Sequence, residues 1–421
     1  MKVEKLNLAN SIKEFERAKQ LMPGGGPPTR RPSFFVPGEY PIFFEEGKGA
    51  RVKDVDGNEY IDYMCAYGPI IIGYRESEID EAVIKQIREK GFCFSLGQTY
   101  ENRLAEKLKE LIPCAEMSLF VKTGSDGTTA SIRLARAHTK RTKIVRCGYH
   151  GWHDWCVKGK GGIPKKLYED VYEFEYNTLE SLQELLKVHG HETAGVIMTP
   201  FGHPLDQSLQ EPKPGFLEGV KELAHQYGAV LIFDEVRTGF RISMGGAQKY
   251  YGVTPDIAVF GKGMANGYAI GVVTGKEEIM TNAGSEVYVS STFFPNSLGY
   301  IAALKTIEFM EKNNVLEAVW EKGRYLMNGI KRAIERYDAG GEISGIPPMM
   351  FISFKNEGEK SSEEKRIDFY TQMIRRGVFI HPFHHGYVCY RHTQEDLDYT
   401  IRAVEESLEY LKNKYPGIRN L

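Results

Sequence analysis

The sequence has no CxxC motif and no tight cluster of cysteines. Its six cysteines lie singly along the chain, at Cys65, Cys93, Cys114, Cys147, Cys156 and Cys389. This spacing predicts neither a structural zinc site nor a disulfide framework. Reduced thiols and a cytoplasmic location are therefore expected.

Long hydrophobic runs and an excess of charge of one sign are also missing. No stretch approaches 18 uninterrupted apolar residues, and residues 1–26 form a charged amphipathic segment without the apolar core and cleavage site of a signal peptide. The 54 Lys and Arg residues nearly balance the 56 Asp and Glu residues, for a formal net charge of −2. This balance gives no electrostatic argument for a nucleic-acid or membrane partner and favours a small molecule.

The chain does have length, since its 421 residues exceed the size at which a single hydrophobic core stops growing. We predict three regions. Residues 1–75 form an N-terminal segment with a helix over 11–21 and a β-hairpin around the Asp-Gly-Asn turn at 56–58. Residues 76–316 form a large domain, and residues 317–421 form a smaller α+β region.

Short apolar runs alternate with helical patterns in the large domain. The runs cover residues 118–123, 143–149, 194–201, 229–235 and 257–263, and the helical patterns cover 127–139, 179–190 and 215–228. Continuous apolar strands separated by helices are typical of a mostly parallel sheet covered on both faces. The predicted fold class is therefore α/β, with ligands expected at the carboxyl ends of the strands.

Two ionisable residues end neighbouring apolar runs. Asp234 closes one run and Lys262, between two glycines, closes the next. Taken singly, the aspartate fits an N-cap or a solvated loop, and the lysine fits a snorkelling or salt-bridged side chain. Taken together, they deliver an acid and an amine to one edge of the sheet, and a desolvated lysine is the group that forms a Schiff base with an aldehyde.

Pyridoxal phosphate (PLP) is such an aldehyde, and the chain offers partners for its other groups. Gly124 and Ser125 lie where an apolar run turns into a helix, and a helix N-terminus favours phosphate. Tyr149 follows another apolar run and could stack on the pyridine ring. His150 and His153 leave a metal site as an alternative, although no third ligand is evident and the glycine between them argues against a helix.

Several motifs together carry a family resemblance that extends over nearly the whole chain. The stretches "GSDGTTASIRLARAHTKRTKI", "YHGWHD", "GAVLIFDEVRTGF" and "SSTFFPNSLG" resemble the class III aminotransferases of the fold type I PLP enzymes, in the glutamate-1-semialdehyde aminomutase branch. The resemblance implies a large PLP-binding domain and a smaller α+β domain made from the N- and C-terminal segments.

The resemblance also implies roles for single residues. Lys262 would bind PLP as a Schiff base and later shuttle a proton, while Asp234 would pair with the pyridine nitrogen. Val236 and Tyr149 would cover the two faces of the ring. Gly124 and Ser125 would bind the phosphate.

Thr292 matches the position that, in this family, reaches the phosphate of the neighbouring subunit. The resemblance therefore implies a homodimer with shared active sites. The alternative for Thr292, from the residues alone, is an ordinary threonine at the end of a strand.

Departures from the aminomutase branch concern the substrate. Arg31, or its neighbour Arg30, aligns with the arginine that binds the substrate carboxylate, and an arginine fork suits that group. On the sequence alone, a solvated loop arginine fits equally well. Tyr67, Thr199 and His384 replace other residues of the branch's substrate region. The family's Gly-Thr-Glu-Ala after the phosphate turn is altered around Asp126, which predicts a looser start of the helix.

We predict a PLP-dependent transaminase that moves an amino group, in ping-pong fashion, from an amino donor to an aldehyde or ketone. Amino acids, amines, amino sugars and cyclitols remain candidate substrates. Glutamate-1-semialdehyde aminomutation and amino-acid racemisation or epimerisation are alternatives on the same lysine. A nicotinamide dehydrogenase would need a G-x-G-x-x-G helix start that is not found after the first strand, and a silent scaffold protein would not need Lys262 with Asp234.

Overall fold

The computed structural model describes residues 3–157, 161–202, 208–355 and 359–415. These residues divide into two compact units. Unit 1 comprises the described residues of 1–76, 204–210 and 317–421, and unit 2 those of 77–203 and 211–316.

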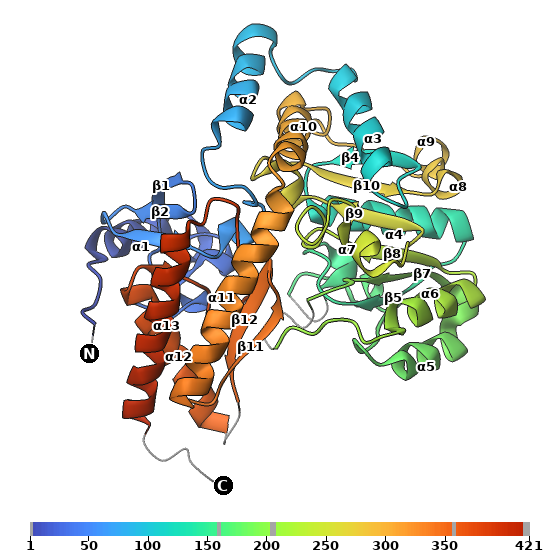
Figure 1. Ribbon diagram of the computed structural model, residues 1–421. Coiled ribbons are helices and arrows are strands. Elements are labelled where there is room, and N and C mark those ends of the chain that lie inside the picture. Colours follow the sequence, from blue (N-terminus) through green and yellow to red (C-terminus); the bar gives the residue numbers. More distant parts are fainter. Residues whose placement is uncertain (1–2, 158–160, 203–207, 356–358, 416–421) are drawn as a thin grey trace. The chain divides into compact units, whose positions relative to one another are not determined.

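Unit 2 is built on a seven-stranded sheet, in the order β4-β10-β9-β8-β7-β5-β6 (Figure 1). The strands are β4 (Met117–Val121), β5 (Lys143–Cys147), β6 (Val171–Glu173), β7 (Thr193–Met198), β8 (Val230–Asp234), β9 (Ile257–Phe260) and β10 (Gly271–Gly275). All pairings are parallel except the two made by β10, so the predicted α/β fold with a mostly parallel sheet is confirmed. Because β10 opposes both its neighbours, the other strands all end at the same edge.

Both faces of this sheet are covered. Every residue of β7, β8, β9 and β10 is buried, although successive side chains of a strand point to opposite faces. Gly127 lets one covering helix approach closely, because a Cβ there would come within 2.5 Å of a Val259 methyl group.

The covering helices follow the strands along the chain. They are α2 (Ser77–Lys90), α3 (Thr99–Leu111), α4 (Gly124–Thr139), α5 (Leu179–His189), α6 (Phe216–Gln226), α7 (Gly246–Tyr251), α8 (Glu277–Met280), α9 (Asn282–Ser285) and α10 (Ser297–Lys312). Helix α4 packs across β7, β9 and β10, and α6 packs on β8 and α5.

Unit 1 combines both ends of the chain. Its strands are β1 (Phe44–Lys48), β2 (Arg51–Asp54), β3 (Glu59–Asp62), β11 (Gly341–Ile346), β12 (Met349–Phe354), β13 (Val378–Phe379) and β14 (Gly386–Tyr387), and its helices are α1 (Ala9–Leu21), α11 (Val315–Tyr337), α12 (Glu359–Arg375) and α13 (Gln394–Lys414). Strand β13 pairs in parallel with β3, so N- and C-terminal segments share one sheet.

The predicted hairpin is confirmed as β2 and β3, which pair in antiparallel fashion. The Asp54 carboxylate stabilises its turn by accepting hydrogen bonds from the backbone N–H groups of Asp56 (3.0 Å) and Asn58 (2.8 Å). Gly57 adopts the left-handed conformation, with φ of 89°, which other residues reach only at a cost.

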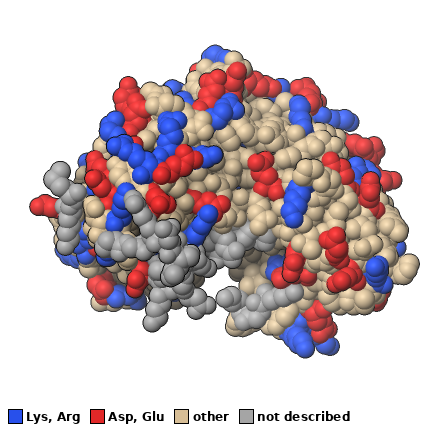
Figure 2. All heavy atoms as spheres, turned by 60° about the horizontal axis from the view of Figure 1, so that its bottom comes forward, with Lys and Arg blue, Asp and Glu red and all other residues tan. Residues whose placement is uncertain are grey.

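Charges of both signs intermingle on the molecular face shown in Figure 2, in keeping with the balanced composition. Among the described helices, none combines the length and the apolar character needed to cross a membrane.

Candidate active site

Predicted site residues gather where strands of unit 2 end. Asp234 is the last residue of β8, and Thr199 immediately follows β7. Tyr149 comes two residues after β5, Lys262 two residues after β9, and Gly124 opens α4 after β4. Because these five strands end at one edge of the sheet, the fold brings these residues to the common edge at which α/β proteins bind ligands.

Lys262 has a constrained backbone and a perturbed amine. Its φ of 41° lies in the left-handed region, which is uncommon for a residue with a Cβ, and it opens the short 3₁₀ helix η8 (Lys262–Ala265). Burial, with help from the nearby Arg237 cation, lowers the pKa of Lys262 to about 7, against the opposing effect of Asp234. The lowered pKa favours the neutral, nucleophilic form of the Lys262 amine near neutral pH.

Asp234 is held by a histidine that the sequence does not single out for this role. The buried His150 ring places Nδ1 2.9 Å from Asp234 Oδ2, and the Val236 backbone N–H donates to Asp234 Oδ1 over 3.1 Å. His150 stacks on Trp155, with ring centroids 6.2 Å apart and planes 11° apart, so the histidine is itself fixed. This arrangement orients the carboxylate.

These contacts also bear on the alternative of a metal site. His150 uses Nδ1 for Asp234, whereas His153 Nδ1 lies 2.7 Å from the hydroxyl of Thr129. The two histidines therefore serve different neighbours.

Glu235, the next acidic residue, has a structural role. It is fully buried, and its carboxylate accepts hydrogen bonds from the backbone N–H groups of Ala247 (2.8 Å) and Gln248 (2.9 Å) and from the Thr238 hydroxyl. Burial raises the pKa of Glu235. Its contacts fix the start of α7 and leave the ligand edge to Asp234.

The start of α4 has the form of a phosphate cradle. Thr123 caps the helix: its hydroxyl accepts from the Asp126 backbone N–H (3.2 Å), and Asp126 Oδ2 accepts from the Thr123 backbone N–H (2.8 Å). The prediction of a looser helix start around Asp126 is therefore wrong, because the shorter acid completes a capping box.

The glycines around this cradle keep it open. A Cβ on Gly124 would lie 3.0 Å from a Val236 methyl group, and a Cβ on Gly151 would lie 2.2 Å from Ser125 Oγ. Gly151 also has φ of 102°, so a side chain there would strain the backbone. The Trp152 backbone N–H donates to Ser125 Oγ over 3.3 Å and ties the loop after Tyr149 to the cradle.

The predicted ring contacts differ in exposure. Tyr149 is 57 % exposed, so its ring is accessible, and Val236 is partly buried against the start of α4. Thr199 is buried, and a Cβ on Gly148 would meet its Oγ1 at 2.6 Å. Thr199 therefore supports the turn that carries Tyr149.

The other three residues predicted for the substrate belong to unit 1. Arg31 donates from Nε to the Gly26 carbonyl oxygen (2.9 Å) and from Nη2 to the Pro23 carbonyl oxygen (2.8 Å). Its guanidinium is thus engaged by its own glycine-rich loop.

Tyr67 and His384 come together within unit 1. The Tyr67 hydroxyl donates to the Thr29 carbonyl oxygen over 2.7 Å, and the Tyr67 and His384 rings meet edge to face, with centroids 5.4 Å apart. Buried His381 lies beside both rings, and burial lowers its pKa to about 3, so it is neutral.

Thr292 lies in the loop between α9 and α10, where its side chain is exposed. Tyr288 and Phe293 of the same loop are 82 % and 60 % exposed. Large apolar side chains rarely gather on a free surface.

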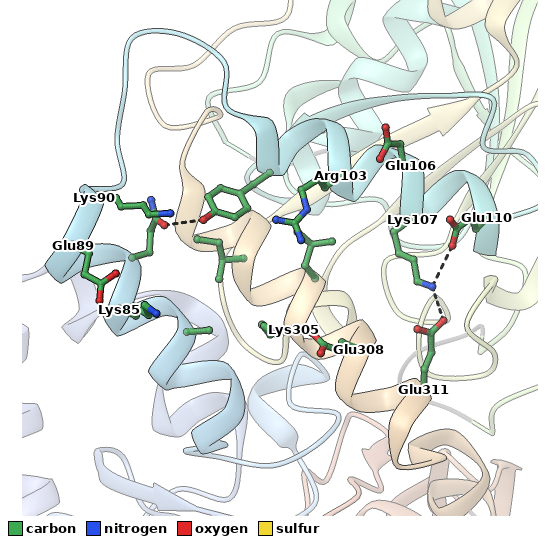
Figure 3. A pocket seen from close by; sticks show the side chains of 15 residues that line it. Lys85, Glu89, Lys90, Arg103, Glu106, Lys107, Glu110, Lys305, Glu308 and Glu311 are labelled. Carbon is green, nitrogen blue, oxygen red and sulfur yellow. Dashed lines mark hydrogen bonds and ion pairs between the residues drawn. The ribbon is translucent and has the colours of Figure 1, made fainter.

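A cavity of about 630 Å³ in unit 2 is lined by none of these residues. It is lined by α2, α3 and α10, and Figure 3 shows its cations interleaved with glutamates. Lys107 bridges Glu110 (3.2 Å) and Glu311 (2.9 Å). Because none of the predicted site residues lines it, we assign it no part in the chemistry.

The residues at the strand ends fit the groups of PLP. The capped start of α4 suits the phosphate, the oriented Asp234 carboxylate suits a protonated pyridine nitrogen, and the neutral Lys262 amine suits the aldehyde. Strands β8 and β9 pair Asp234 with Val259, on the strand that leads to Lys262, so the acid and the amine are neighbours.

Comparison with known proteins agrees with this chemistry. Residues 36–405 match the family model described as "Aminotransferase class-III". The chain is 59% identical, over 97% of its length and 99% of the relative's, to the 3-aminobutyryl-CoA aminotransferase of Cloacimonas acidaminovorans. It is 35% identical, over 96% of its length and 100% of the relative's, to the glutamate-1-semialdehyde 2,1-aminomutase of Archaeoglobus fulgidus.

Solved structures show the same fold with the cofactor. The FumI protein of Sphingopyxis sp. MTA144, solved in a PLP form, superposes with a TM-score of 0.91 at 29% identity, covering 97% of this chain and 98% of that one. The family model, the aminotransferase relative and the solved PLP structure agree. This chain therefore belongs to the class III aminotransferases and is a PLP-dependent transaminase.

Proposed function

We propose that this transaminase acts on 3-aminoacyl-CoA thioesters. The amino group leaves carbon 3 of the thioester, which becomes a ketone, and a second carbonyl compound later takes the amine. The 59% identity to a 3-aminobutyryl-CoA aminotransferase, over nearly the whole of both chains, supports this substrate class.

One contact in unit 1 carries the choice of a thioester over a free acid. Arg31, the residue aligned with the branch's carboxylate-binding arginine, is engaged by the carbonyl oxygens of Gly26 and Pro23. A thioester has no free carboxylate and needs no such arginine. The neighbouring Arg30 is exposed, and it supports amino acids with a free carboxylate as the second candidate.

The residues at the sheet edge divide the work of transamination. When present, PLP binds the amino group of the substrate and withdraws electrons from carbon 3, which carries that group. Lys262 Nζ would accept the proton from that carbon and later give it up again, so it would act as the proton carrier of the transfer. Asp234, oriented by His150, would face the pyridine nitrogen, while Ser125 and the start of α4 would hold the phosphate. Tyr149 and Val236 cover the ring faces.

Substrate preference tests this proposal. The purified, PLP-loaded protein should use 3-aminobutyryl-CoA with kcat/KM at least about 100-fold above that for free 3-aminobutyrate. Polar groups of the site that bind the coenzyme A part are left without a partner when an analogue lacks it. Product ketone is measured for both, with glutamate 1-semialdehyde and enantiopure amino acids included for aminomutation and racemisation. Equal use of the free acid, lost on Arg30→Ala, would instead support the second candidate.

We also propose a homodimer in which Thr292 completes the phosphate site of the partner subunit. Two loops of unit 2 support this contact: Ser297 N–H donates to the Phe92 carbonyl oxygen over 2.9 Å, which ties the Thr292 loop to a loop where Phe94 and Leu96 are 43 % and 80 % exposed. Exposed apolar side chains of this kind suit burial against a second copy.

A complementation experiment tests the role of Thr292. Thr292→Ala and Lys262→Ala homodimers should both be impaired, whereas mixed dimers regain one intact site, with Lys262 from one subunit and Thr292 from the other. Activity after subunit exchange is therefore expected to rise well above the sum of the two separate variants. Simple additivity would show that Thr292 serves its own subunit or neither.

The cytoplasm is the proposed location. The six cysteines all lie within the described residues and form no disulfide, as suits a reducing compartment. Cell fractionation tests this; recovery in the medium would contradict it.

A further inference from the structure

A surface beside the phosphate cradle combines exposed tryptophan with arginine. Two cavities, of about 280 and 370 Å³, lie along the outer face of α4 and share Thr129, Arg133 and His153 as lining residues. The larger also includes Arg136 and Trp152. The larger lies within the size range of small-molecule sites, whereas the smaller is also lined by Tyr288 and Phe294 of the loop proposed to contact the partner subunit.

The chemistry of the larger cavity suits a nucleotide. Arg133 and Arg136 are three residues apart in α4 and so project from the same side of the helix. Trp152 is 73 % exposed and offers an indole face on which a base can stack. Arginine forks bind phosphate groups with two parallel hydrogen bonds.

Neighbouring groups hold these side chains in place. Arg133 donates to the Tyr288 carbonyl oxygen (3.2 Å) and Arg136 to the Thr142 carbonyl oxygen (2.8 Å), so both are anchored through neutral groups. Asp170 interacts with the Arg136 charge, and Asp154 lines the same cavity, where it can accept from the amino group of an adenine.

The floor of the cavity is ordered by a short hydrogen-bond chain. Trp155 Nε1 donates to Thr129 Oγ1 over 2.9 Å, and the same hydroxyl lies 2.7 Å from His153 Nδ1. On the rim, Leu167 follows the exposed Lys165 and Lys166, which add positive charge.

The length of α4 between the phosphate cradle and the two arginines is similar to that of the arm of coenzyme A. Helix α4 begins at the phosphate cradle and rises about 1.5 Å per residue, so Arg133 and Arg136 lie about 13–18 Å along it from Gly124. The pantetheine arm resembles four to five residues of extended chain, roughly 15 Å at about 3.5 Å per residue. A thioester at the strand ends can therefore place its nucleotide end at these arginines.

Resting on the proposed function, we infer that the surface formed by Arg133, Arg136, Trp152 and His153 binds the phosphorylated adenosine end of the coenzyme A thioester. The arginines bind its phosphates and Trp152 stacks on the adenine. The pantetheine arm then follows the outer face of α4 toward the cradle. This site distinguishes a coenzyme A thioester from a shorter thioester with the same acyl group.

Direct binding tests the site without turnover. Isothermal titration calorimetry on the PLP-loaded protein should show coenzyme A binding at least about 10-fold more tightly than pantetheine, because charged hydrogen bonds to phosphate are among the stronger ones. The double variant Arg133→Gln/Arg136→Gln should lose this difference. Arg103→Gln, a matched arginine in the mixed-charge cavity of Figure 3, should keep it. Equal binding of coenzyme A and pantetheine to the unaltered protein would overturn the inference.

Kinetics separate this inference from the proposed function. The ratio of kcat/KM for 3-aminobutyryl-CoA to that for 3-aminobutyryl-pantetheine should fall about 10-fold in the double variant; general damage would lower both and leave the ratio unchanged. Equal use of both thioesters by the unaltered protein would refute the nucleotide site while upholding the proposed function. Coenzyme A binding that depends on the arginines, without thioester turnover, would refute the proposed function and uphold the site.

Two further outcomes are decisive. If the double variant does not fold, Arg133→Gln alone replaces it in both measurements. If gel filtration shows that the variant has changed its oligomeric state while keeping its preference for coenzyme A, then a second copy of the chain covers this surface, and the inference is wrong.

Discussion

Replacing Lys262 by alanine is expected to lower kcat by about 10⁴-fold, because one side chain supplies both the nucleophilic amine and the proton carrier. The amine is primed for both roles, since burial and the Arg237 cation lower its pKa to about 7. The phosphate cradle at the start of α4 is unaltered, so the variant should still bind PLP. Borohydride should fix the cofactor to the unaltered protein at Lys262 and should not fix it to the variant. Steady-state kinetics and mass spectrometry of the reduced protein measure the two effects.

The control for this prediction is Lys249→Ala, an exposed lysine in α7 of the same unit, which should keep normal activity. Circular dichroism should show that both variants are folded. Substantial turnover by Lys262→Ala, or borohydride labelling of another lysine, would remove Lys262 from its role.

The fold of unit 2 was predictable because parallel strands buried on both faces have a plain signature. Strand β8, with all of Val230–Asp234 buried, reads as a continuous apolar run, and so do β7 and β9. Strand β10 runs against its neighbours, and nothing in its own composition distinguishes it from a parallel strand. Its direction depends on the connection from η8, which the hydrophobic pattern does not encode.

Candidate site residues that follow a strand could also be identified from the sequence. An ionisable residue or a glycine directly after an apolar run is a pattern that needs no knowledge of the fold. The partnership of His150 with Asp234 was not visible, because 84 residues separate them and only the parallel sheet brings them together. The capping box of Thr123 and Asp126 follows a Thr-x-x-Asp pattern, whereas comparison with the family marks Asp126 only as a departure.

Residues that bond to the backbone were the hardest to predict. Alignment predicts that Arg31 binds a carboxylate, yet its acceptors are the carbonyl oxygens of Pro23 and Gly26. Because every residue has a backbone carbonyl, the sequence does not show which ones accept from a side chain. The three glycines Gly24, Gly25 and Gly26 give the loop its left-handed turns, with φ of 64°, 80° and 129°. A Cβ on Gly24 would lie 2.4 Å from the Arg31 guanidinium carbon, so the glycine makes this close packing possible.

Changing Asp234 to asparagine should lower kcat by about 10³-fold, the scale on which loss of a fixed charge at a reacting centre acts. The substitution keeps the shape of the side chain and the oxygen that accepts from the Val236 backbone N–H, so the turn after β8 should survive. It removes the negative charge that His150 orients toward the ligand edge. The variant would offer bound PLP no anion to balance a protonated pyridine nitrogen, so electron withdrawal by the ring would weaken. Kinetics and the absorption spectrum of the bound cofactor should both change.

His150→Gln provides the graded comparison for this prediction. It leaves the Asp234 charge in place and removes the stacked ring that orients it, so it acts as a change in a positioning residue. A smaller loss, of about 10-fold, is expected from a single hydrogen bond to a charged group. The exposed Asp338→Asn should leave both kcat and the spectrum unchanged. If Asp234→Asn retained normal kcat with an unaltered spectrum, the electrostatic role of Asp234 would be refuted, and the His150–Asp234 pair would be only a structural contact at the end of β8.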